Sequence, residues 1–455
     1  MHIPAKVTVM GLGLFGGGLG AAEFFARRGS RVLVTDMKGE EALRPSIEKL
    51  NGLPIEYCLG EHRERDFAET DLVVASPAVP RTSPFLQTAR KHGVPLETEI
   101  SLFFKMCRAP IVGVTGSIGK TTTTSLIGAM LANGMRKVHV GGNIGRSLLS
   151  DAESIAPGDI VVLELSSFQL EWLGEAALSP AVAVVTNIHP NHLDRHGTMQ
   201  NYIAAKRNIV SNQKPAGAAV LNLDDPEIRT WADGLRGECL CFSTVEEPRS
   251  GSFVRGGRIM LRRNGTETEI AEADCLRLPG RHNVANALAA VAACSVAGAA
   301  PAAMSKGLAQ FEGIEHRLEL VCRRNGVLYY NDSKATTPES AMAALDAFDS
   351  PIVLIAGGYD KKVPLDKFAE KVFRRARVAI LLGKTADTLG RLLDQYSRDG
   401  FRWLRVQSLE EAVARAASLA DSGDVVLLSP ACASYDMFTN YEERGNKFKE
   451  MCRAL

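Results

Sequence analysis

One stretch constrains the fold of this chain more than any other, the run IVGVTGSIGKTTTTSLIGAML from Ile111 to Leu131. Its first residues, as far as Val114, are mostly β-branched and predict a buried strand. A turn punctuated by glycine follows, and Lys120 then opens a run with apolar residues at helical spacing. The order of strand, glycine turn and helix predicts a parallel α/β unit built around this loop.

Such a loop is suited to bind phosphate groups. Glycine lets the backbone curl so that successive N–H groups point inward, and the helix adds the positive end of its dipole. Lys120 can then reach the outer phosphates of a nucleotide, and the Thr121 hydroxyl can become a ligand of Mg²⁺. The strict phosphate-loop pattern requires glycine where this chain has Val114, so an ordinary glycine-rich turn is the alternative. We expect a nucleotide site here.

Size and composition favour an ordinary globular protein of several domains. A chain of 455 residues is longer than one hydrophobic core usually serves. The formal net charge is +1, which gives no overall field toward nucleic acid or an anionic membrane. The cysteines form no CxxC pair, and no apolar run reaches the roughly 18 residues of a membrane span. We therefore expect a cytoplasmic protein with reduced thiols that neither binds nucleic acid nor inserts into a membrane.

The start of the chain contains a second glycine turn. After a predicted strand over Lys6 to Met10, the run GLGLFG from Gly11 to Gly16 fits the dinucleotide pattern GxGxxG. A predicted helix over Ala21 to Arg28 and a strand that ends at Asp36 complete a βαβ unit. Asp36 stands where such a fold holds a ribose hydroxyl. These residues alone favour NAD(P), with FAD or another nucleotide-bearing substrate as alternatives.

Polar groups accompany two further predicted strands. Glu164 interrupts the apolar strand Asp159 to Leu165, and a buried carboxylate is costly unless a cation or hydrogen bonds compensate it. Bound Mg²⁺ would do so, and a structural ion pair is the alternative. His192 lies in a histidine-rich loop after the strand Ala181 to Asn187, where a ligand and a plain loop residue both fit. Lys206, on the next helix, is by its pattern alone a solvated charge.

The rest of the chain predicts hairpins and a third α/β unit. Short alternating runs from Gly237 to Leu278 predict β-hairpins appended to the α/β core. Asn283 and Asn286 stand at the start of an alanine-rich helix, where they can cap it or contact a nucleobase. Buried strands alternate with helices after Gly313, which predicts a further parallel sheet. The expected fold class is α/β in three domains: a Rossmann-like domain over residues 1–106, a central phosphate-loop domain with a mainly parallel sheet over 107–313, and a Rossmann-like domain over 314–455.

In order and spacing, these motifs resemble those of the Mur ligase family, the ATP-dependent amino-acid ligases of peptidoglycan precursor synthesis. The resemblance covers essentially the whole chain. It rests on GVTGSIGKTT, ELSSFQLE, NHLDRHG with the later AAK lysine, PGRHNVANALAA, EHRLE, NDSKATTP and SPACASYDMF followed by RG. The last domain lacks the DNPR motif of the diaminopimelate-adding members. The resemblance therefore implies the family member that adds D-glutamate to UDP-N-acetylmuramoyl-L-alanine.

The resemblance changes several expectations. It implies that the first domain holds the UDP of the substrate instead of NAD(P). It implies an acyl-phosphate mechanism, in which ATP phosphorylates the L-alanyl carboxylate and the amine of D-glutamate then displaces phosphate. It also implies two Mg²⁺ sites and a CO₂-derived carbamate on Lys206, which reverses the interpretation of this lysine as a solvated charge. Small-molecule substrates and a monomeric state complete the expectation.

The resemblance assigns residues to the expected site. Lys120, Lys206, His192 and Glu164 would be catalytic, and Thr121, Glu164, His192 and carbamylated Lys206 would hold metal ions. ATP would contact Gly116, Ser117, Ile118, Gly119, Lys120, Thr121, Thr122, Asn283, Asn286, Arg317 and Asp332. The UDP substrate would contact Leu14, Phe15, Asp36, Ser76, Asn143, Ser166 and Gln169. D-Glutamate would contact Lys334, Thr336, Lys361, Ser434 and Tyr435, where Tyr435 replaces the family's aliphatic residue.

Three other functions stay open on the sequence. A related Mur-type ligase would use another amino acid or nucleotide substrate. An NAD(P)-dependent oxidoreductase fused to an ATPase would explain GLGLFG and Asp36, although the sequence offers no hydride-transfer site. A non-catalytic nucleotide-binding switch would leave Lys206 and the segment SPACASYD without a purpose.

Overall fold

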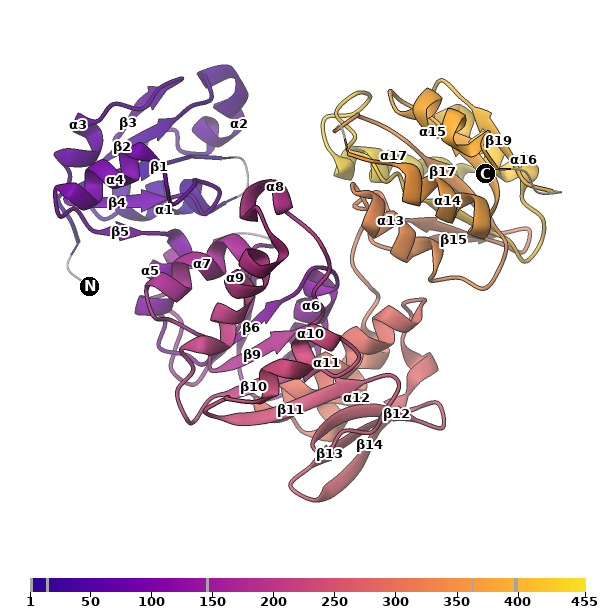
Figure 1. Cartoon of the computed structure of the whole chain (residues 1–455), viewed down its shortest axis with the longest axis horizontal. Coiled ribbons are helices and arrows are strands. Elements are labelled where there is room, and N and C mark those ends of the chain that lie inside the picture. Colours follow the sequence, from indigo (N-terminus) through magenta and orange to yellow (C-terminus); the bar gives the residue numbers. More distant parts are fainter. Residues whose placement is uncertain (1–2, 14–15, 145–146, 362, 397–399) are drawn as a thin grey trace. The chain divides into compact units, whose positions relative to one another are not determined.

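The computed structural model describes residues 3–13, 16–144, 147–361, 363–396 and 400–455 (Figure 1). Contacts between residues divide the chain into two compact units. The first unit comprises Met1–Ala273 and Ala285–Gln310, and the second comprises Asp274–Val284 and Phe311–Leu455. The first unit contains two sheets and the second contains one, in agreement with the predicted α/β class. The domain boundaries expected near residues 106 and 313 stay predictions.

The first sheet has five parallel strands in the order β3-β2-β1-β4-β5. The predicted helix over Ala21 to Arg28 is displaced, because α1 already begins at Gly17. The first turn of α1 contains Gly18, and glycine has a low helix propensity, so the sequence pattern does not indicate a helix there. Glycine is nevertheless needed at position 18, because a Cβ atom would overlap the Gly11 carbonyl. The elements of this part are β1 (Lys6–Met10), α1 (Gly17–Ala26), β2 (Arg31–Asp36), α2 (Glu40–Lys49), β3 (Ile55–Leu59), α3 (Arg65–Ala68), β4 (Leu72–Ala75), α4 (Pro84–Lys91), β5 (Leu96–Glu97) and α5 (Glu99–Met106).

The second sheet has nine strands in the order β14-β13-β12-β11-β10-β9-β6-β8-β7. The predicted hairpins are confirmed for β12 to β14, which pair antiparallel, but β11 and β12 continue the parallel sheet. The strands are β6 (Ile111–Thr115), β7 (Val138–Gly142), β8 (Ile160–Glu164), β9 (Val182–Val185), β10 (Ala218–Asn222), β11 (Glu238–Ser243), β12 (Gly251–Arg255), β13 (Arg258–Arg263) and β14 (Thr266–Glu272). The α-helices are α6 (Lys120–Ala132), α7 (Ser167–Glu175), α8 (Leu193–His196), α9 (Met199–Ser211), α10 (Pro226–Arg229), α11 (Arg281–Val296) and α12 (Pro301–Gln310).

A ladder of ion pairs crosses the outer strands of this sheet. Arg255 pairs with Glu267 at 2.8 Å, and Arg258 on β13 pairs with Glu269 on β14 at 2.9 Å. Arg262 contacts Glu247 at 3.0 Å. These side chains remain partly exposed, so each pair contributes little stability by itself. Their alternating charges cover the end of the sheet formed by β14.

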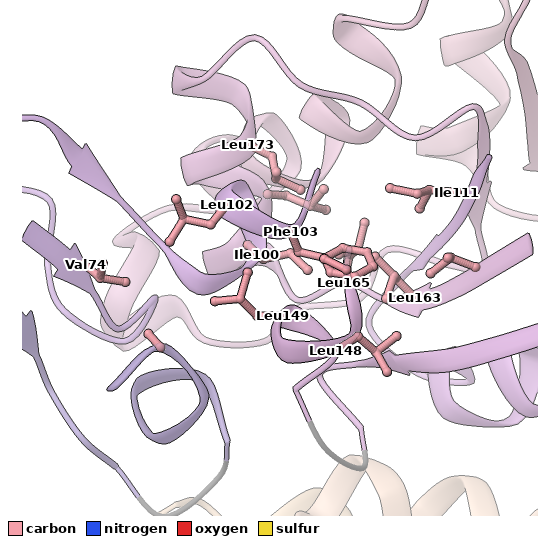
Figure 2. Close-up of a cluster of buried hydrophobic side chains, with 14 of the residues drawn as sticks. Val74, Ile100, Leu102, Phe103, Ile111, Leu148, Leu149, Leu163, Leu165 and Leu173 are labelled. Atoms are coloured by element: carbon pink, nitrogen blue, oxygen red, sulfur yellow. The ribbon is translucent and has the colours of Figure 1, made fainter. Parts of the chain in front are cut away.

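One buried cluster joins the first and second sheets. Ile100 and Phe103 of α5 belong to the same cluster as Val74 of β4 and Leu163 of β8, as the close-up in Figure 2 shows. All four side chains are at most 1% exposed. Burial of a side chain of this size contributes roughly 1.5–3 kcal/mol. The two sheets are therefore held by a common core, which fixes the residues between them.

The sheet of the second unit has six strands in the order β15-β16-β20-β17-β18-β19. Only β15 pairs antiparallel among the described strands of this sheet, so the predicted parallel sheet is confirmed. Successive residues of β17 enter two different hydrophobic clusters, so both sheet faces are covered. The elements are β15 (Glu319–Arg324), β16 (Val327–Asn331), α13 (Pro338–Leu345), β17 (Ile352–Ala356), α14 (Asp366–Arg375), β18 (Ala376–Leu381), α15 (Ala386–Leu393), β19 (Arg402–Arg405), α16 (Leu409–Leu419), β20 (Val425–Leu428) and α17 (Tyr441–Ala454).

The cysteines are free thiols, as the sequence predicts. The sulfur atoms of Cys239 and Cys241 lie 4.0 Å apart on the same side of β11. In the part of the chain that the structure describes, no helix combines the length and the apolar character needed to cross a membrane.

Candidate active site

The phosphate loop between β6 and α6 depends on two glycines. Gly116 has a φ angle of 154° and Gly119 a φ angle of 85°, both in the region that favours glycine. A Cβ atom on Gly116 would overlap the Thr186 hydroxyl, and one on Gly119 would overlap the Asn286 side chain. Both positions therefore require glycine on conformational and steric grounds. The loop ends at the N-terminus of α6, where backbone N–H groups favour anions.

The segment after β9 holds this loop in place. Oδ1 of Asn187 accepts a hydrogen bond from the Ile118 N–H group at 2.8 Å, and its Nδ2 donates to the Ile118 carbonyl at 2.8 Å. The Ser117 hydroxyl donates to the His189 carbonyl at 2.9 Å. Sequence reasoning missed Asn187, although a polar residue directly after a buried strand was a usable signal. The loop is thus fixed before any ligand binds.

Lys120 lies across the loop that it follows. Its Nζ donates hydrogen bonds to the carbonyls of Gly116 at 3.0 Å and Ser117 at 3.1 Å. The structure therefore brings the predicted lysine to the predicted loop, while its contact with ATP stays a prediction. Thr122, on the first turn of α6, is buried.

Two predicted metal ligands, Thr121 and Glu164, are in direct contact. The Thr121 hydroxyl donates to Glu164 Oε2 at 2.7 Å, and Asn143 Nδ2 donates to Glu164 Oε1 at 3.0 Å. Glu164 ends β8 and is 3% exposed, so these hydrogen bonds offset the cost of its burial. A hydroxyl beside a carboxylate is a hard-oxygen donor set that fits Mg²⁺. The described residues contain no group of three or more His, Cys, Asp or Glu side chains placed for a metal ion.

Lys206 is buried against the phosphate loop, with 1% of its surface exposed. Its Nζ donates to the Gly116 carbonyl at 2.7 Å and to the Thr115 hydroxyl at 3.3 Å. Burial, and next the charge of Lys120, hold the pKa of its amine well below the ordinary value, and Glu164 opposes this shift. The expectation of a solvated lysine from pattern alone is therefore wrong, because α9 turns this face toward β6.

His192 is the N-cap residue of α8 and has a left-handed φ angle of 53°. Burial lowers the pKa of its imidazole, and the charges of Lys120 and Lys206 lower it further. The imidazole is therefore neutral at pH 7, which is the form that binds metal ions. Because the charges of Lys120 and Lys206 affect its pKa, His192 lies near both lysines and thus near the phosphate loop.

A cavity of about 340 Å³ lies between the first sheet and the loops of the second. It contains four of the residues predicted for the UDP substrate, Ser76, Asn143, Ser166 and Gln169. It is also lined by Leu12, Gly13 and Gly16 to Gly18 of the N-terminal glycine turn, a name that covers the described residues 11–13 and 16–18. The Ser166 hydroxyl and the Gln169 side chain form a capping box at the start of α7, so their positions are fixed. The remaining lining residues are Lys38, Pro77, Ala78, Glu99, Gly142, Ser147 and Phe168.

Asp36 is not among the residues that line this cavity. Its carboxylate instead binds backbone groups of the glycine turn. Its Oδ2 accepts hydrogen bonds from the N–H groups of Leu12 at 2.9 Å and Gly13 at 3.4 Å. Asp36 therefore positions the turn, and its predicted contact with the nucleotide stays a prediction. Leu14 and Phe15 lie outside the described residues.

Asn286 and Asn283 have different surroundings. Asn286 contacts the phosphate loop of the first unit, and its Oδ1 accepts a hydrogen bond from the Thr123 hydroxyl at 3.3 Å. Asn283 belongs to the second unit, where its Nδ2 donates to the Pro279 carbonyl at 2.7 Å. Both side chains are buried, so each also supports the backbone around it.

Arg317 and Asp332 lie close together in the second unit. Burial raises the pKa of Asp332 to about 7, while the nearby charge of Arg317 works against this rise. Asp332 accepts hydrogen bonds from the Ser429 hydroxyl at 2.7 Å and the Leu318 N–H group at 3.2 Å. The Arg317 Nε atom is buried and has no hydrogen-bond partner in the described part of the chain. A ligand anion would satisfy it.

The residues predicted for D-glutamate gather on loops at one edge of the third sheet. Lys361 Nζ lies 3.4 Å from the Thr336 carbonyl, to which it donates. Lys334 lies with its Nζ 5.8 Å from the ring centre of Tyr441. Ser434 is buried, whereas Tyr435 is 62% exposed. Lys361 is exposed as well, whereas Lys334 and Thr336 are half-buried.

Sequence reasoning missed Arg444, which organises these loops although it is 2% exposed. Its guanidinium donates to the Ser333 hydroxyl and carbonyl, each at 2.9 Å. It also donates to the carbonyls of Cys432 at 3.2 Å and Ala433 at 3.4 Å. The arginine of the RG pair in the sequence thus connects the loop after β16 to the loop after β20.

Comparison with protein families accounts for most of the chain. The Mur ligase MurD-like N-terminal domain matches residues 5–97, and the Mur ligase middle domain matches residues 114–294. The Mur ligase glutamate ligase domain matches residues 316–432. Among solved structures, UDP-N-acetylmuramate-alanine ligase MurC from Thermotoga maritima has a TM-score of 0.63 at 22% identity, covering 99% of each chain. A pseudomurein peptide ligase type C from Methanothermus fervidus gives a TM-score of 0.60 at 19% identity, with the same coverage. These likenesses show the three-domain Mur ligase fold.

Curated relatives are considerably more similar. The UDP-N-acetylmuramoylalanine–D-glutamate ligase of Symbiobacterium thermophilum is 44% identical over 100% of this chain and 99% of its own length. The ligase of the same name from Roseiflexus sp. is 44% identical over 99% of this chain and 98% of its own length. The chain therefore belongs to the Mur ligase family, in its group of UDP-N-acetylmuramoylalanine–D-glutamate ligases.

Proposed function

We propose that this protein joins D-glutamate to UDP-N-acetylmuramoyl-L-alanine with conversion of ATP to ADP and phosphate, in cytoplasmic peptidoglycan precursor synthesis. The observation that carries the proposal is the full-length match to curated ligases of this specificity. Three features of the structure support the proposal. They are the phosphate loop, the cavity of about 340 Å³ lined by Ser76 and Asn143 (the nucleotide cavity), and the group of lysines in the second unit. They supply one place each for ATP, a UDP-linked substrate and a dianionic amino acid.

The chemistry begins with a carboxylate, which is a poor acylating agent because its oxygen leaves with difficulty. Transfer of the γ-phosphoryl group to the L-alanyl carboxylate makes an acyl phosphate. The amine of D-glutamate attacks the acyl carbon, the carbon–oxygen bond to phosphate breaks, and an amide forms. Two anions must approach each other in the first step, so positive charge is the main requirement. Lys120 meets it at the phosphate loop.

Thr121 and Glu164 would hold one Mg²⁺ ion, and His192 would help to hold a second. Bound Mg²⁺ supplies positive charge against phosphate and carboxylate oxygens. The fit rests on the hydroxyl–carboxylate contact between Thr121 and Glu164 and on the neutral imidazole of His192. Asn143 keeps the Glu164 carboxylate oriented from its other side.

Lys206 is proposed to carry a carbamate. Only an unprotonated amine can attack CO₂, and the buried environment of Lys206 favours that form. A bond forms between the neutral Nζ and the carbon of CO₂, one proton leaves from the nitrogen to solvent, and the neutral amine becomes an anionic carbamate. This group could then ligate the second metal ion, which an ammonium group could not.

The other contacts follow the family. Arg317, Asp332, Asn283 and Asn286 are proposed for ATP, and the orphaned Arg317 Nε supports a phosphate contact. The proposed D-glutamate contacts give the substrate's carboxylates cations and hydroxyl groups, as a dianionic amino acid requires. They are Lys334, Thr336, Lys361, Ser434 and Tyr435. A monomeric state is part of the proposal.

Phosphate release tests the reaction. With ATP, UDP-N-acetylmuramoyl-L-alanine, Mg²⁺ and bicarbonate, we expect release with D-glutamate and none with L-glutamate. A preference for another amino acid would identify a different Mur-type ligase. Absence of release with any amino acid would overturn the proposal. An absorbance change dependent on nicotinamide would favour the oxidoreductase alternative.

A further inference from the structure

Glu99 places a buried carboxyl group in the wall of the nucleotide cavity, and none of the roles assigned so far falls on it. It is the first residue of α5 and is 8% exposed. It lines the cavity together with the N-terminal glycine turn and Ser147. Its Oε1 atom accepts a hydrogen bond from the Ser147 hydroxyl, its only side-chain partner within the described ranges. The carboxyl group therefore has hydrogen-bonding capacity left for a ligand.

A negative charge at this position would oppose the binding of a diphosphate. The glycine turn leads into the N-terminus of α1, where backbone N–H groups favour anions. Ser147 contacts this helix, since a Cβ atom on Gly20 would overlap the Ser147 side chain. Glu99 is thus one side chain away from the N-terminal part of α1. An ionised carboxylate repels an anion there, whereas a protonated carboxyl group can donate a hydrogen bond to it.

The surroundings of Glu99 decide its charge. Burial raises its pKa to about 7, and the hydrogen bond from Ser147 limits the rise. Lys38 is the other ionisable residue among the described residues that line the cavity. Helix α5 packs against α1, α7 and the short helix Leu149–Asp151. The charged residues on these four elements do not contribute to the pKa shift of Glu99. They are Lys105 on α5, Glu23 on α1, Glu171 and Glu175 on α7, and Asp151 on the short helix. Both protonation states are therefore populated at neutral pH.

We propose that Glu99 binds the UDP substrate in its protonated form and donates a hydrogen bond from its carboxyl O–H group to an oxygen of the bound nucleotide-sugar. This inference rests on the proposed function, because it takes the UDP substrate to occupy this cavity. Where Glu99 is ionised in the free enzyme, binding takes up a proton from solvent. The affinity is therefore greatest at low pH and falls as the pH rises through the pKa of the carboxyl group.

Isothermal titration calorimetry with UDP-N-acetylmuramoyl-L-alanine between pH 6 and pH 8.5 tests this coupling. Two buffers with different ionisation enthalpies reveal proton uptake. The diphosphate diester of the ligand does not titrate in this range, so the uptake belongs to the protein. For a group with a pKa of about 7, we expect the dissociation constant to rise about thirtyfold from pH 6 to pH 8.5.

Variants connect the coupling to this residue. Glu99→Gln keeps a donor without a titratable charge, so its dissociation constant should not change with pH and no proton uptake should occur. Ser147→Ala removes a hydrogen bond that favours the ionised form, so the midpoint should move to higher pH. Lys38→Met, a change in the same cavity wall, should retain the pH slope of the parent protein.

The outcomes separate the inference from the proposed function. A parent protein whose affinity is constant from pH 6 to pH 8.5 overturns the inference and leaves the ligase function intact. So does a Glu99→Gln variant with the parent's slope. Failure to bind the nucleotide substrate at every pH overturns the proposed function, and the inference with it.

Discussion

Lys206 shows how its surroundings change what a single side chain can do. The run AAKRNIV indicates a helix, but the pattern does not tell which face of that helix is buried. The structure buries Lys206 beside Thr115 and Gly116, two residues some ninety positions earlier in the chain. This contact is not local in sequence, so only the resemblance to a known family could predict a special role. Glu164 was easier to recognise, because a carboxylate inside an apolar strand is conspicuous by itself.

We expect Lys206→Ala to reduce ligase activity at least about 100-fold, as loss of a metal-site group does. Acetate or formate should restore part of it, because a free carboxylate can replace the lost carbamate. The measurement is phosphate release with and without these ions. Arg207→Ala, a change at the exposed neighbouring residue, is the matched control and should retain the parent rate. An alanine variant at position 206 with the parent rate would contradict the assignment.

The buried amine of Lys206 should reduce the stability of the folded protein when it carries no carbamate. Lys206→Met has a similar volume and removes a buried amine, so we expect the free energy of unfolding in bicarbonate-free buffer to rise by about 1–3 kcal/mol. Denaturant unfolding at neutral pH measures the change. The effect should shrink above the ordinary pKa of lysine, because there the unfolded chain no longer gains a proton. A destabilised methionine variant would show that the amine contributes to folding.

At the scale of elements, the phosphate loop could be predicted from the sequence. The hydrogen bonds from Asn187 that hold this loop could not. Strand β6, the glycine turn and α6 follow one another directly, so their order is visible in the sequence. The support comes from the segment after β9, which neighbours β6 in the sheet but follows it by some seventy residues. Asn187 uses both its acceptor and its donor on Ile118. This pairing uses the backbone groups of Ile118, so it does not depend on the side chain at this position.

Removal of this support should weaken ATP binding specifically. We expect Asn187→Ala to raise the KM for ATP about thirtyfold, because two hydrogen bonds of about 1 kcal/mol each no longer order the loop. The KM for D-glutamate should stay within a factor of two. Steady-state kinetics with each substrate varied in turn measures both values. Equal increases in the two KM values would indicate a general loss of structure instead.

At the scale of the whole molecule, the α/β class and the mainly parallel sheets were predictable from strand patterns, whereas the ligand of the first domain was not. GLGLFG and Asp36 indicated a dinucleotide fold, and the first sheet has that topology. The carboxylate of Asp36 nevertheless supports the turn from behind, through the N–H groups of Leu12 and Gly13. A pattern that identifies the fold therefore does not identify the bound nucleotide.

In the second unit, Arg444 connects the loop after β16 to the loop after β20 by its hydrogen bonds. Arg444→Met would leave the Ser333, Cys432 and Ala433 carbonyls without this donor, and we expect a loss of about 3 kcal/mol in the stability of this unit. Hydrogen exchange followed by mass spectrometry should show lower protection over residues 311–455 and unchanged protection over 16–144. Arg453→Met, at an exposed position near the C-terminus, is the control. Equal loss in both ranges would contradict a local role.

The charged ladder across β12, β13 and β14 has a consequence for how copies of the protein meet one another. A sheet that ends in an open strand invites a neighbouring chain to add its own strand there. Along β14, glutamate side chains at positions 267, 269 and 272 are exposed, and a second copy arriving edge to edge would bring the same charges against them. Repulsion between these like charges thus opposes polymerisation through β14, and concentrated salt would weaken that repulsion.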